Sequence, residues 1–355
     1  MTTAVKNNGK AHRQAHTNGA QTAIVAGGAG FLGSHLCARL LREGYKVIAI
    51  DNFCTSAAST VDALRHHSSF TLLERDIASL DPDEFDRADA IFNLACAASP
   101  IHYQRSPIDT LFSSVRGMEN LLMVARRTGA RIFQASTSEI YGHPTIHPQS
   151  ETYWGYVNPI GPRSCYDEGK RCAETLCVLY EQEYGVNVRI ARIFNTYGPG
   201  MRLSDGRVVI NFIVQALNDE LITLYGDGMQ TRSFCYVDDL IEGIMRLMDP
   251  HNQVRGPINL GNPAEVTVRE LAEAVIRLTG SDSVLGTRPL PIDDPPRRRP
   301  DISLAARVLD WRPRVDLETG LALTIRDVER RLADMDVLRS PAVAGAVASF
   351  AGARA

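Results

Sequence analysis

The sequence predicts an α/β fold in which helices cover both faces of a parallel sheet, followed by a smaller C-terminal α/β domain. Three observations lead to this prediction. Short apolar runs alternate with helical stretches as far as residue 193, and a glycine-rich turn follows the first apolar run. Loop-rich sequence begins after residue 195. Such alternation favours parallel strands joined by crossover helices. With the glycine-rich turn it predicts a Rossmann-type, doubly wound sheet.

The predicted elements follow one another regularly along the chain. Helices are expected at 31–43, 110–128 and 166–184, and strands are expected at 22–27, 46–50, 70–74, 90–95, 131–136 and 188–193. Open sheets of this kind bind ligands at the carboxyl ends of their strands. We therefore expect Ser136 to Glu139, after the fifth strand, and Asn195, after the sixth, to lie at the ligand site.

The glycine-rich turn predicts a dinucleotide site. Gly27, Gly30 and Gly33 fall at GxxGxxG spacing after the first strand, with Gly33 in the first turn of a helix that begins near Phe31. Glycines let the backbone approach a pyrophosphate, which the amides at a helix N-terminus hold. Asp51 ends the second strand, where a carboxylate accepts the ribose hydroxyls of an adenosine. No arginine follows Asp51 directly to receive a 2′-phosphate, so we expect NAD rather than NADP.

Loop-rich sequence after Asn195 predicts a second domain that closes over the substrate. The segment 234–240 is expected to return the chain to the first domain. We therefore predict a disordered tail at 1–20, an NAD-binding domain at 21–197 plus 233–262, a substrate-binding domain at 198–232 plus 263–336, and a flexible tail at 337–355.

Composition indicates a globular cytoplasmic protein. The 355 residues are 44% hydrophobic and 22% charged, and the net charge of −3 gives no reason to expect nucleic acid or an anionic membrane as a partner. No apolar run approaches the length of a membrane span, and the first 20 residues lack the apolar core of a secretory signal. The seven cysteines lack CxxC spacing, so we expect reduced thiols and no metal site.

Tyr166 and Lys170 are the candidate acid–base pair. Four residues apart on a helix, they project from the same face. An isolated tyrosine has a pKa of about 10, and a neighbouring ammonium favours the phenolate. The pair is therefore predicted to act as a general base near neutral pH, with a nicotinamide cation acting in the same direction. The alternative is an amphipathic tyrosine on a surface helix.

Longer segments carry a resemblance to a known family. They are the glycine turn and residues 51–53, 135–142, 147–151, 158–171, 191–199, 205–209, 230–234 and 298–301. With these segments the chain resembles, over nearly all of 22–335, the extended short-chain dehydrogenase/reductases, or NAD-dependent epimerase/dehydratase family, and within it the UDP-glucuronate decarboxylases (UDP-xylose synthases).

The resemblance implies a complete reaction. Tyr166, assisted by Lys170, takes the proton of the sugar 4-hydroxyl while C4 is oxidised by bound NAD. The resulting ketone is β to the carboxylate, so carbon dioxide can leave, and re-reduction at C4 gives UDP-xylose. Thr137 is expected to contact the 4-oxygen. Ser138 and Glu139 are expected to orient the sugar acid or the water that protonates C5, although a strand-end carboxylate such as Glu139 can instead cap a helix.

The resemblance also implies the binding residues. Those for NAD are Gly27, Gly30, Phe31, Leu32, Gly33, Asp51, Asn52, Phe53, Thr55, Asp76, Ile77, Leu94, Cys96, Tyr166, Lys170, Thr196 and Arg207. Those for the nucleotide sugar are Asn195, Val209, Tyr225, Arg232 and Arg298. Arg232 is expected at the diphosphate and Arg298 at the sugar carboxylate, the alternative for Arg298 being a solvated basic run at 297–299.

Three alternatives stay open at this point. A nucleotide-sugar 4-epimerase shares the glycine turn and the tyrosine–lysine pair but has no need of Glu139. A 4,6-dehydratase usually has aspartate where this chain has Ser138. A non-catalytic NAD-binding scaffold is the third. The helices at 110–128 and 166–184 resemble those that pair in dimers of the superfamily, so a homodimer is expected. The sequence does not separate a uridine from a thymidine nucleotide.

Overall fold

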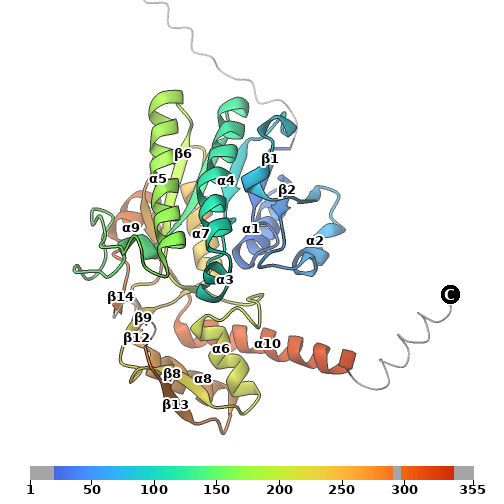
Figure 1. Cartoon of the computed structure of the whole chain (residues 1–355). Helices are drawn as coiled ribbons and strands as arrows, with labels where there is room; N and C mark the ends of the chain where they lie inside the picture. The colour runs from blue at the N-terminus through green and yellow to red at the C-terminus, as the bar shows by residue number, and fades with distance from the viewer. Residues whose placement is uncertain (1–19, 291–296, 340–355) are drawn as a thin grey trace, which may run out of the picture.

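The computed structural model describes residues 20–290 and 297–339. They form one large sheet with smaller sheets and helices packed below its lower edge (Figure 1). The predicted tail at 1–20 falls outside the described residues except for residue 20, and the predicted tail at 337–355 falls outside them from residue 340. No helix within the described ranges is long and apolar enough to cross a membrane.

The large sheet is parallel throughout and has the strand order β11-β6-β5-β4-β1-β2-β3. Its strands are β1 (Thr22–Ala26), β2 (Lys46–Asp51), β3 (Phe70–Glu74), β4 (Ala90–Asn93), β5 (Arg131–Thr137), β6 (Val188–Ile193) and β11 (Ile258–Leu260). The strand order reverses between β1 and β4, which makes this point the topological switch of the sheet. The prediction of a Rossmann-type sheet is confirmed.

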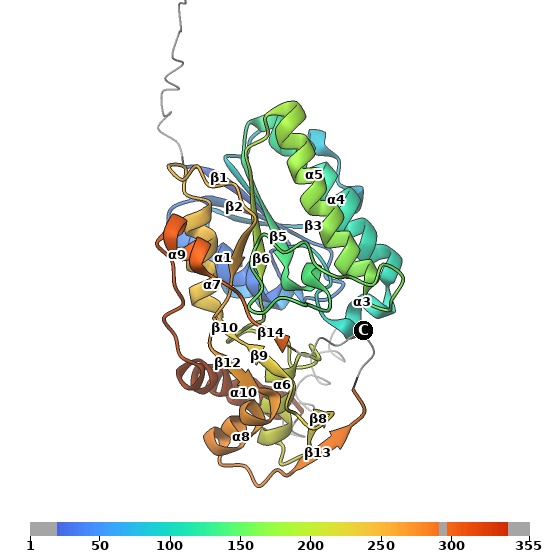
Figure 2. The same cartoon turned by 90° about the vertical axis from the view of Figure 1, so that its left-hand side faces the viewer.

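Helices cover both faces of the large sheet (Figure 2). Val25 of β1 belongs to a core cluster that includes Leu40, whereas its neighbour Ile24 belongs to a second cluster with Leu121. Because side chains alternate across a strand, a strand with consecutive buried apolar residues contributes to a core on each face. The helices on the first face are α1 (Phe31–Arg42) and α7 (Val237–Leu247), and those on the second are α4 (Pro107–Thr128) and α5 (Ser164–Tyr184).

The remaining elements form a smaller layer below the carboxyl ends of the large sheet (Figure 1). Its sheets have the orders β12-β9-β14 and β13-β8. The strands are β8 (Ile222–Tyr225), β9 (Thr231–Ser233), β12 (Glu265–Thr267), β13 (Leu285–Arg288) and β14 (Arg297–Arg298), and the helices are α6 (Val208–Leu217), α8 (Val268–Thr279) and α10 (Leu317–Arg339).

Two short strands connect the layers. β7 (Thr196–Tyr197) pairs in parallel with β10 (Cys235–Tyr236), which leads directly into α7 on the large sheet. The predicted return of the chain at 234–240 is therefore confirmed. After β14 the chain forms α9 (Ser303–Leu309), and Trp311 then donates a hydrogen bond to the carbonyl oxygen of Asp239 in α7. The bounds of the two predicted domains stay a prediction.

Several element boundaries differ from the predicted ones by a few residues. The strand predicted at 90–95 ends at Asn93, and β5 continues through Thr137, paired with β6. α4 begins at Pro107, because proline is tolerated in the first turn of a helix. Thr137 is therefore the last residue of a strand, and Ser138 and Glu139 lie in the short helix η4 (Ser138–Tyr141) that follows.

Candidate active site

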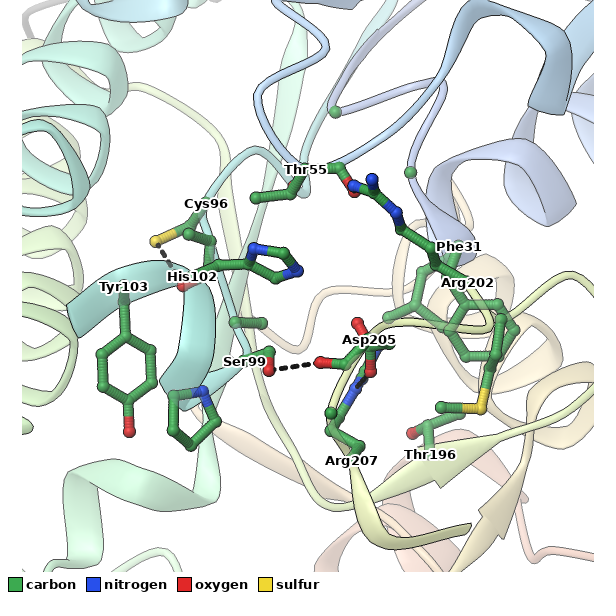
Figure 3. A pocket seen from close by; sticks show the side chains of 18 of the residues that line it. Phe31, Thr55, Cys96, Ser99, His102, Tyr103, Thr196, Arg202, Asp205 and Arg207 are labelled. Atoms are coloured by element: carbon green, nitrogen blue, oxygen red, sulfur yellow. Dashed lines mark hydrogen bonds and ion pairs between the residues drawn. The ribbon is translucent and has the colours of Figure 1, made fainter. Parts of the chain in front are cut away.

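A cavity of about 750 Å³ opens at the carboxyl ends of the large sheet, between that sheet and the smaller layer. Every catalytic, cofactor-binding and substrate-binding residue predicted from the sequence lines it, with the exception of Phe53. Figure 3 shows part of this cavity, into which side chains project from α1, the segment before α4 and the loop before α6. The fold thus brings residues that are as far apart in the sequence as Gly27 and Arg298 to one cavity.

Phe53 is the predicted cofactor-binding residue that does not line the cavity, and its contact with NAD stays a prediction. Its φ of 56° is left-handed, its amide donates to Asp51 Oδ1 at 2.9 Å, and its ring packs against the core beside α1. Phe53 therefore shapes the turn after β2 and does not line the cavity.

The glycine turn forms a tight cradle between β1 and α1. Gly27 has a φ of 75°, and its amide donates to the carbonyl oxygen of Ile50 at 2.8 Å. A Cβ at Gly33 would collide with the carbonyl oxygen of Gly27, and a Cβ at Gly27 would lie 2.9 Å from the amide nitrogen of Ala95. Only glycine fits this close packing, which leaves the N-terminus of α1 open to an anion.

Asp51 is held rigidly at the end of β2. Its Oδ2 accepts the amide of Ala29 at 2.9 Å, and its Oδ1 accepts the hydroxyl of Ser56 at 2.7 Å. Although the side chain is only 8% exposed, it lines the cavity. A fixed carboxylate one strand away from the glycine turn fits the adenosine ribose of NAD. The residues present therefore fit this cofactor.

Tyr166 and Lys170 both lie buried on the first turns of α5. The Lys170 ammonium is 5.9 Å from the centre of the Tyr166 ring and donates to the carbonyl oxygen of Ala135 at 2.9 Å. Burial lowers the pKa of Lys170. Burial also raises the pKa of Tyr166, partly opposed by a hydrogen bond with Thr137. The surface-helix alternative is thus wrong, whereas the action of the pair as a general base near neutral pH stays a prediction.

Glu139 is clamped by two arginines. Both its carboxylate oxygens accept hydrogen bonds from Arg298, at 2.9 Å for Nη2 and Oε2, and Arg163 donates to Oε2. Burial alone would raise the pKa of Glu139, but these guanidinium groups outweigh it and lower the pKa to about 2. Thr137 is the residue that caps η4, so the capping interpretation of Glu139 is wrong.

Arg298 is 5% exposed, so the alternative of a solvated basic run is wrong at this position. Asp167, next to Tyr166, is a further acid beside the cluster. Its Oδ1 is buried without a hydrogen-bond partner. Burial, followed by the negative charge of Glu139, raises its pKa to about 7.

The substrate residues come from separate elements. Asn195 follows β6, Val209 lies in the first turn of α6, and Tyr225 ends β8. Arg232 and Arg298 face each other as register partners in β9 and β14. The small three-stranded sheet therefore presents two buried arginines to one end of the cavity.

Sequence analysis missed several lining residues. The ring of Tyr103 stacks on that of Tyr166, with centroids 5.3 Å apart and planes at 4°. Ser99 Oγ donates to the carbonyl oxygen of Asp205 at 2.6 Å, joining the two loops shown in Figure 3. Arg163 lies within one of the segments that carry the resemblance, but its ion pair with Glu139 spans 24 residues. No local pattern signals such a contact.

The described ranges hold no group of three or more histidine, cysteine, aspartate or glutamate side chains arranged to bind a metal ion.

Known proteins are similar to this chain in sequence and in fold. The pattern of the NAD dependent epimerase/dehydratase family matches residues 23–261. A UDP-glucuronic acid decarboxylase from Arabidopsis thaliana is 50% identical over 313 residues, which cover 88% of this chain and 71% of that protein. One from Danio rerio is 49% identical over 309 residues, covering 87% and 73%. The solved UDP-glucuronic acid 4-epimerase from Bacillus cereus, in complex with UDP-glucuronic acid and NAD, is 26% identical with a TM-score of 0.80, over 87% of this chain and 99% of that one.

Proposed function

The chain belongs to the NAD dependent epimerase/dehydratase family, and we propose that it decarboxylates UDP-glucuronate to UDP-xylose with NAD as its bound cofactor. The decarboxylases that are about half identical over most of the chain support this activity. The observation that carries it in the structure is the pair of arginines on Glu139, in the same cavity as Tyr166 and Lys170.

The arginine cluster suits an acidic sugar. Two guanidinium groups face one fully ionised carboxylate, and the pKa of about 7 at Asp167 keeps that acid partly neutral. Guanidinium groups bind carboxylates through paired hydrogen bonds, so buried arginines at this end of the cavity suit the carboxylate of a sugar acid.

The NAD-binding half of the cavity comprises the glycine cradle, Asp51 and the loop at 94–96. Bound NAD supplies the acceptor for a hydride from C4 and the donor that later restores the alcohol. Thr137 forms a hydrogen bond with Tyr166 at the end of β5, and Lys170 lies buried beside the tyrosine ring. As a phenolate, Tyr166 would take the proton of the 4-hydroxyl and afterwards return it.

Loss of carbon dioxide follows from the chemistry of the ketone. The carboxylate is β to C4, so the electron pair of the breaking C5–C6 bond passes into the carbonyl and leaves an enolate. Glu139 stays ionised at a pKa of about 2 and so is not the proton donor. Its role is to hold Arg298 and Arg163 on the sugar acid and, with Ser138, to orient the water that protonates C5.

Incubation of the purified protein with UDP-glucuronate and NAD tests the function. Mass spectrometry and proton NMR should show UDP-xylose with no net NADH. An unchanged mass with a new 4-epimer would identify an epimerase instead, the activity named for the Bacillus cereus structure. No conversion would reject both activities for this substrate.

We propose that the protein forms a homodimer and that it is located in the cytoplasm. α4 and α5 lie side by side on the outer face of the sheet (Figure 2). Both leave large apolar side chains exposed, among them Met123, Leu179 and Tyr184. A second copy of the chain would bury this surface. All seven cysteines are free thiols, which suits a reducing compartment. Light scattering at micromolar concentration should give twice the mass of one chain, and a single-chain mass would reject the dimer.

A further inference from the structure

Three consecutive arginines, Arg297 to Arg299, offer the site three chemically equal side chains. Only the middle one reaches Glu139. Arg297 is exposed, and Arg298 is 5% exposed. Because side chains alternate along a strand, a slip of one residue would turn Arg298 away and present a neighbouring arginine. Which of the three arginines meets Glu139 therefore depends on the register of the strand.

The strand itself specifies this register weakly. β14 has two residues, and among the described residues its ladder partners are Thr231 and Arg232 of β9. Ser233 Oγ adds a hydrogen bond to the carbonyl oxygen of Arg298 at 3.2 Å. The Arg299 side chain contributes no anchor through its Nε, which is buried without a hydrogen-bond partner. A second anchor on the other side of the segment is needed.

Gln149 provides that anchor. Its backbone amide donates to the carbonyl oxygen of Arg299 at 2.9 Å, and its carbonyl oxygen accepts the amide of Asp301 at 2.8 Å. Its side-chain Oε1 accepts the amide of Arg299 at 2.9 Å. Both backbone groups of Arg299 are thus bonded to one residue, which is itself only 1% exposed.

Gln149 is in turn held in place from two directions. Its Nε2 donates to the carbonyl oxygen of Ile146 at 2.8 Å, which fixes the side-chain amide. Asn259 Nδ2 of β11 donates to the carbonyl oxygens of both Gln149 and Asp301, at 3.0 and 3.1 Å. The anchor is therefore tied to the large sheet, which also carries Thr137 at the end of β5.

We propose that Gln149 is a positioning residue that locks the register of residues 298–301 and thereby selects Arg298, among three arginines, as the partner of Glu139 and the substrate carboxylate. The kinetic test of this role rests on the proposed function, because it measures the decarboxylation of UDP-glucuronate. Gln149 is not among the residues that line the cavity, and its side chain bonds the backbone of Arg299 and Ile146, so we expect it to act through the placement of Arg298.

A double-mutant cycle tests this role. Gln149→Met keeps the side-chain volume but leaves the amide of Arg299 unpaired, and should lower kcat/KM for UDP-glucuronate about tenfold. In an Arg298→Ala background the same change should have no further effect, because its target is gone. Ser150→Ala, in the same loop, removes only a contact with Thr152 and should match the wild type. Effects of Gln149→Met that multiply with those of Arg298→Ala would overturn the proposal.

Hydrogen exchange gives a readout that does not depend on activity. In the wild-type protein the amides of Arg299 and Asp301 should be protected, and Gln149→Met should speed exchange of the Arg299 amide about tenfold. Rapid exchange of both amides in the wild type would overturn the register lock, even if the variant did not fold. A wild-type protein with protected amides and no decarboxylation would instead reject the proposed function and leave the lock in place.

Discussion

At the scale of single residues, Tyr166 lies in surroundings that oppose its ionisation. Burial raises its pKa, and the Lys170 ammonium is engaged by the carbonyl oxygen of Ala135. The pair was predicted from its spacing as a base near neutral pH, but spacing reports neither desolvation nor the partner of the ammonium. Only as a phenolate could Tyr166 take the proton of the 4-hydroxyl, so we expect the positive charge of a bound nicotinamide to be needed to oppose the effect of burial on its pKa.

Removal of the Tyr166 hydroxyl tests this role. Tyr166→Phe should lower kcat for UDP-xylose formation by about 10³-fold, because general acid–base catalysis is lost, while NAD still binds. Steady-state kinetics and a binding titration measure the two effects. Tyr180→Phe, on the same helix but outside the cavity lining, is the control. Substantial turnover by Tyr166→Phe would remove Tyr166 from the mechanism.

Asp167 makes the stability of the protein depend on pH. Its pKa rises from 3.8 to about 7 on folding, chiefly through burial and then through Glu139, with Arg163 and Arg298 acting in the opposite direction. The folded state thus binds this proton more tightly, so the resulting stability is full below about pH 3.8 and is lost as the pH rises through 7.

Asp167→Asn should therefore flatten the decline in stability between pH 4 and pH 8, because asparagine has no proton to lose. Urea unfolding of wild type and variant across this range measures the difference. Glu168→Gln, a partly exposed neighbour on α5, is the control. Parallel stability curves for wild type and Asp167→Asn would show that Asp167 ionises in the folded protein as it does in the unfolded one.

At the scale of elements, the sequence predicted those that its periodicity defines. Six strands of the large sheet and the helices α1, α4 and α5 were expected within a few residues of their bounds. The seventh strand, β11, has three residues and was missed, as were β7, β10 and β14. Strands this short depend on tertiary pairing rather than on a local pattern, so a window of sequence does not reveal them.

The part of the site that local sequence patterns define was also predictable. The glycine turn, Asp51 and the Tyr166–Lys170 pair are local patterns with a physical cause, and all line the cavity. The clamp on Glu139 is different, because Arg298 lies 159 residues away along the chain. The resemblance to a family indicated Arg298, whereas its contact with Glu139 required the fold.

The glycine turn gives a test at the level of this element. In Gly33→Ala the new Cβ meets the carbonyl oxygen of Gly27, so β1 and α1 have to separate. We expect a loss of about 1–3 kcal/mol in the free energy of unfolding and NAD binding weakened by at least about tenfold. Denaturant titration and calorimetry measure them. Ser34→Ala, one residue along α1, is the control, and unchanged NAD affinity in Gly33→Ala would contradict the cradle.

At the scale of the whole molecule, the cavity exists because two layers meet. The large sheet contributes Asp51, Thr137 and Tyr166, while the smaller layer contributes Arg232 and Arg298. The first group suits the oxidation of an alcohol by NAD, and the second suits an anionic sugar nucleotide. Oxidation and decarboxylation at one site require both layers, and the same cofactor has to serve the start and the end of the reaction.

Transfer of an isotope through one turnover tests this claim most directly. UDP-glucuronate carrying deuterium at C4 should give carbon dioxide and UDP-xylose that retains the deuterium at C4, because the same bound NAD takes the hydride and returns it. Mass spectrometry and NMR locate the label, and excess unlabelled NADH in solution should not dilute it. UDP-xylose that has lost the C4 deuterium, or labelled UDP-glucuronate recovered without loss of carbon dioxide, would contradict the account.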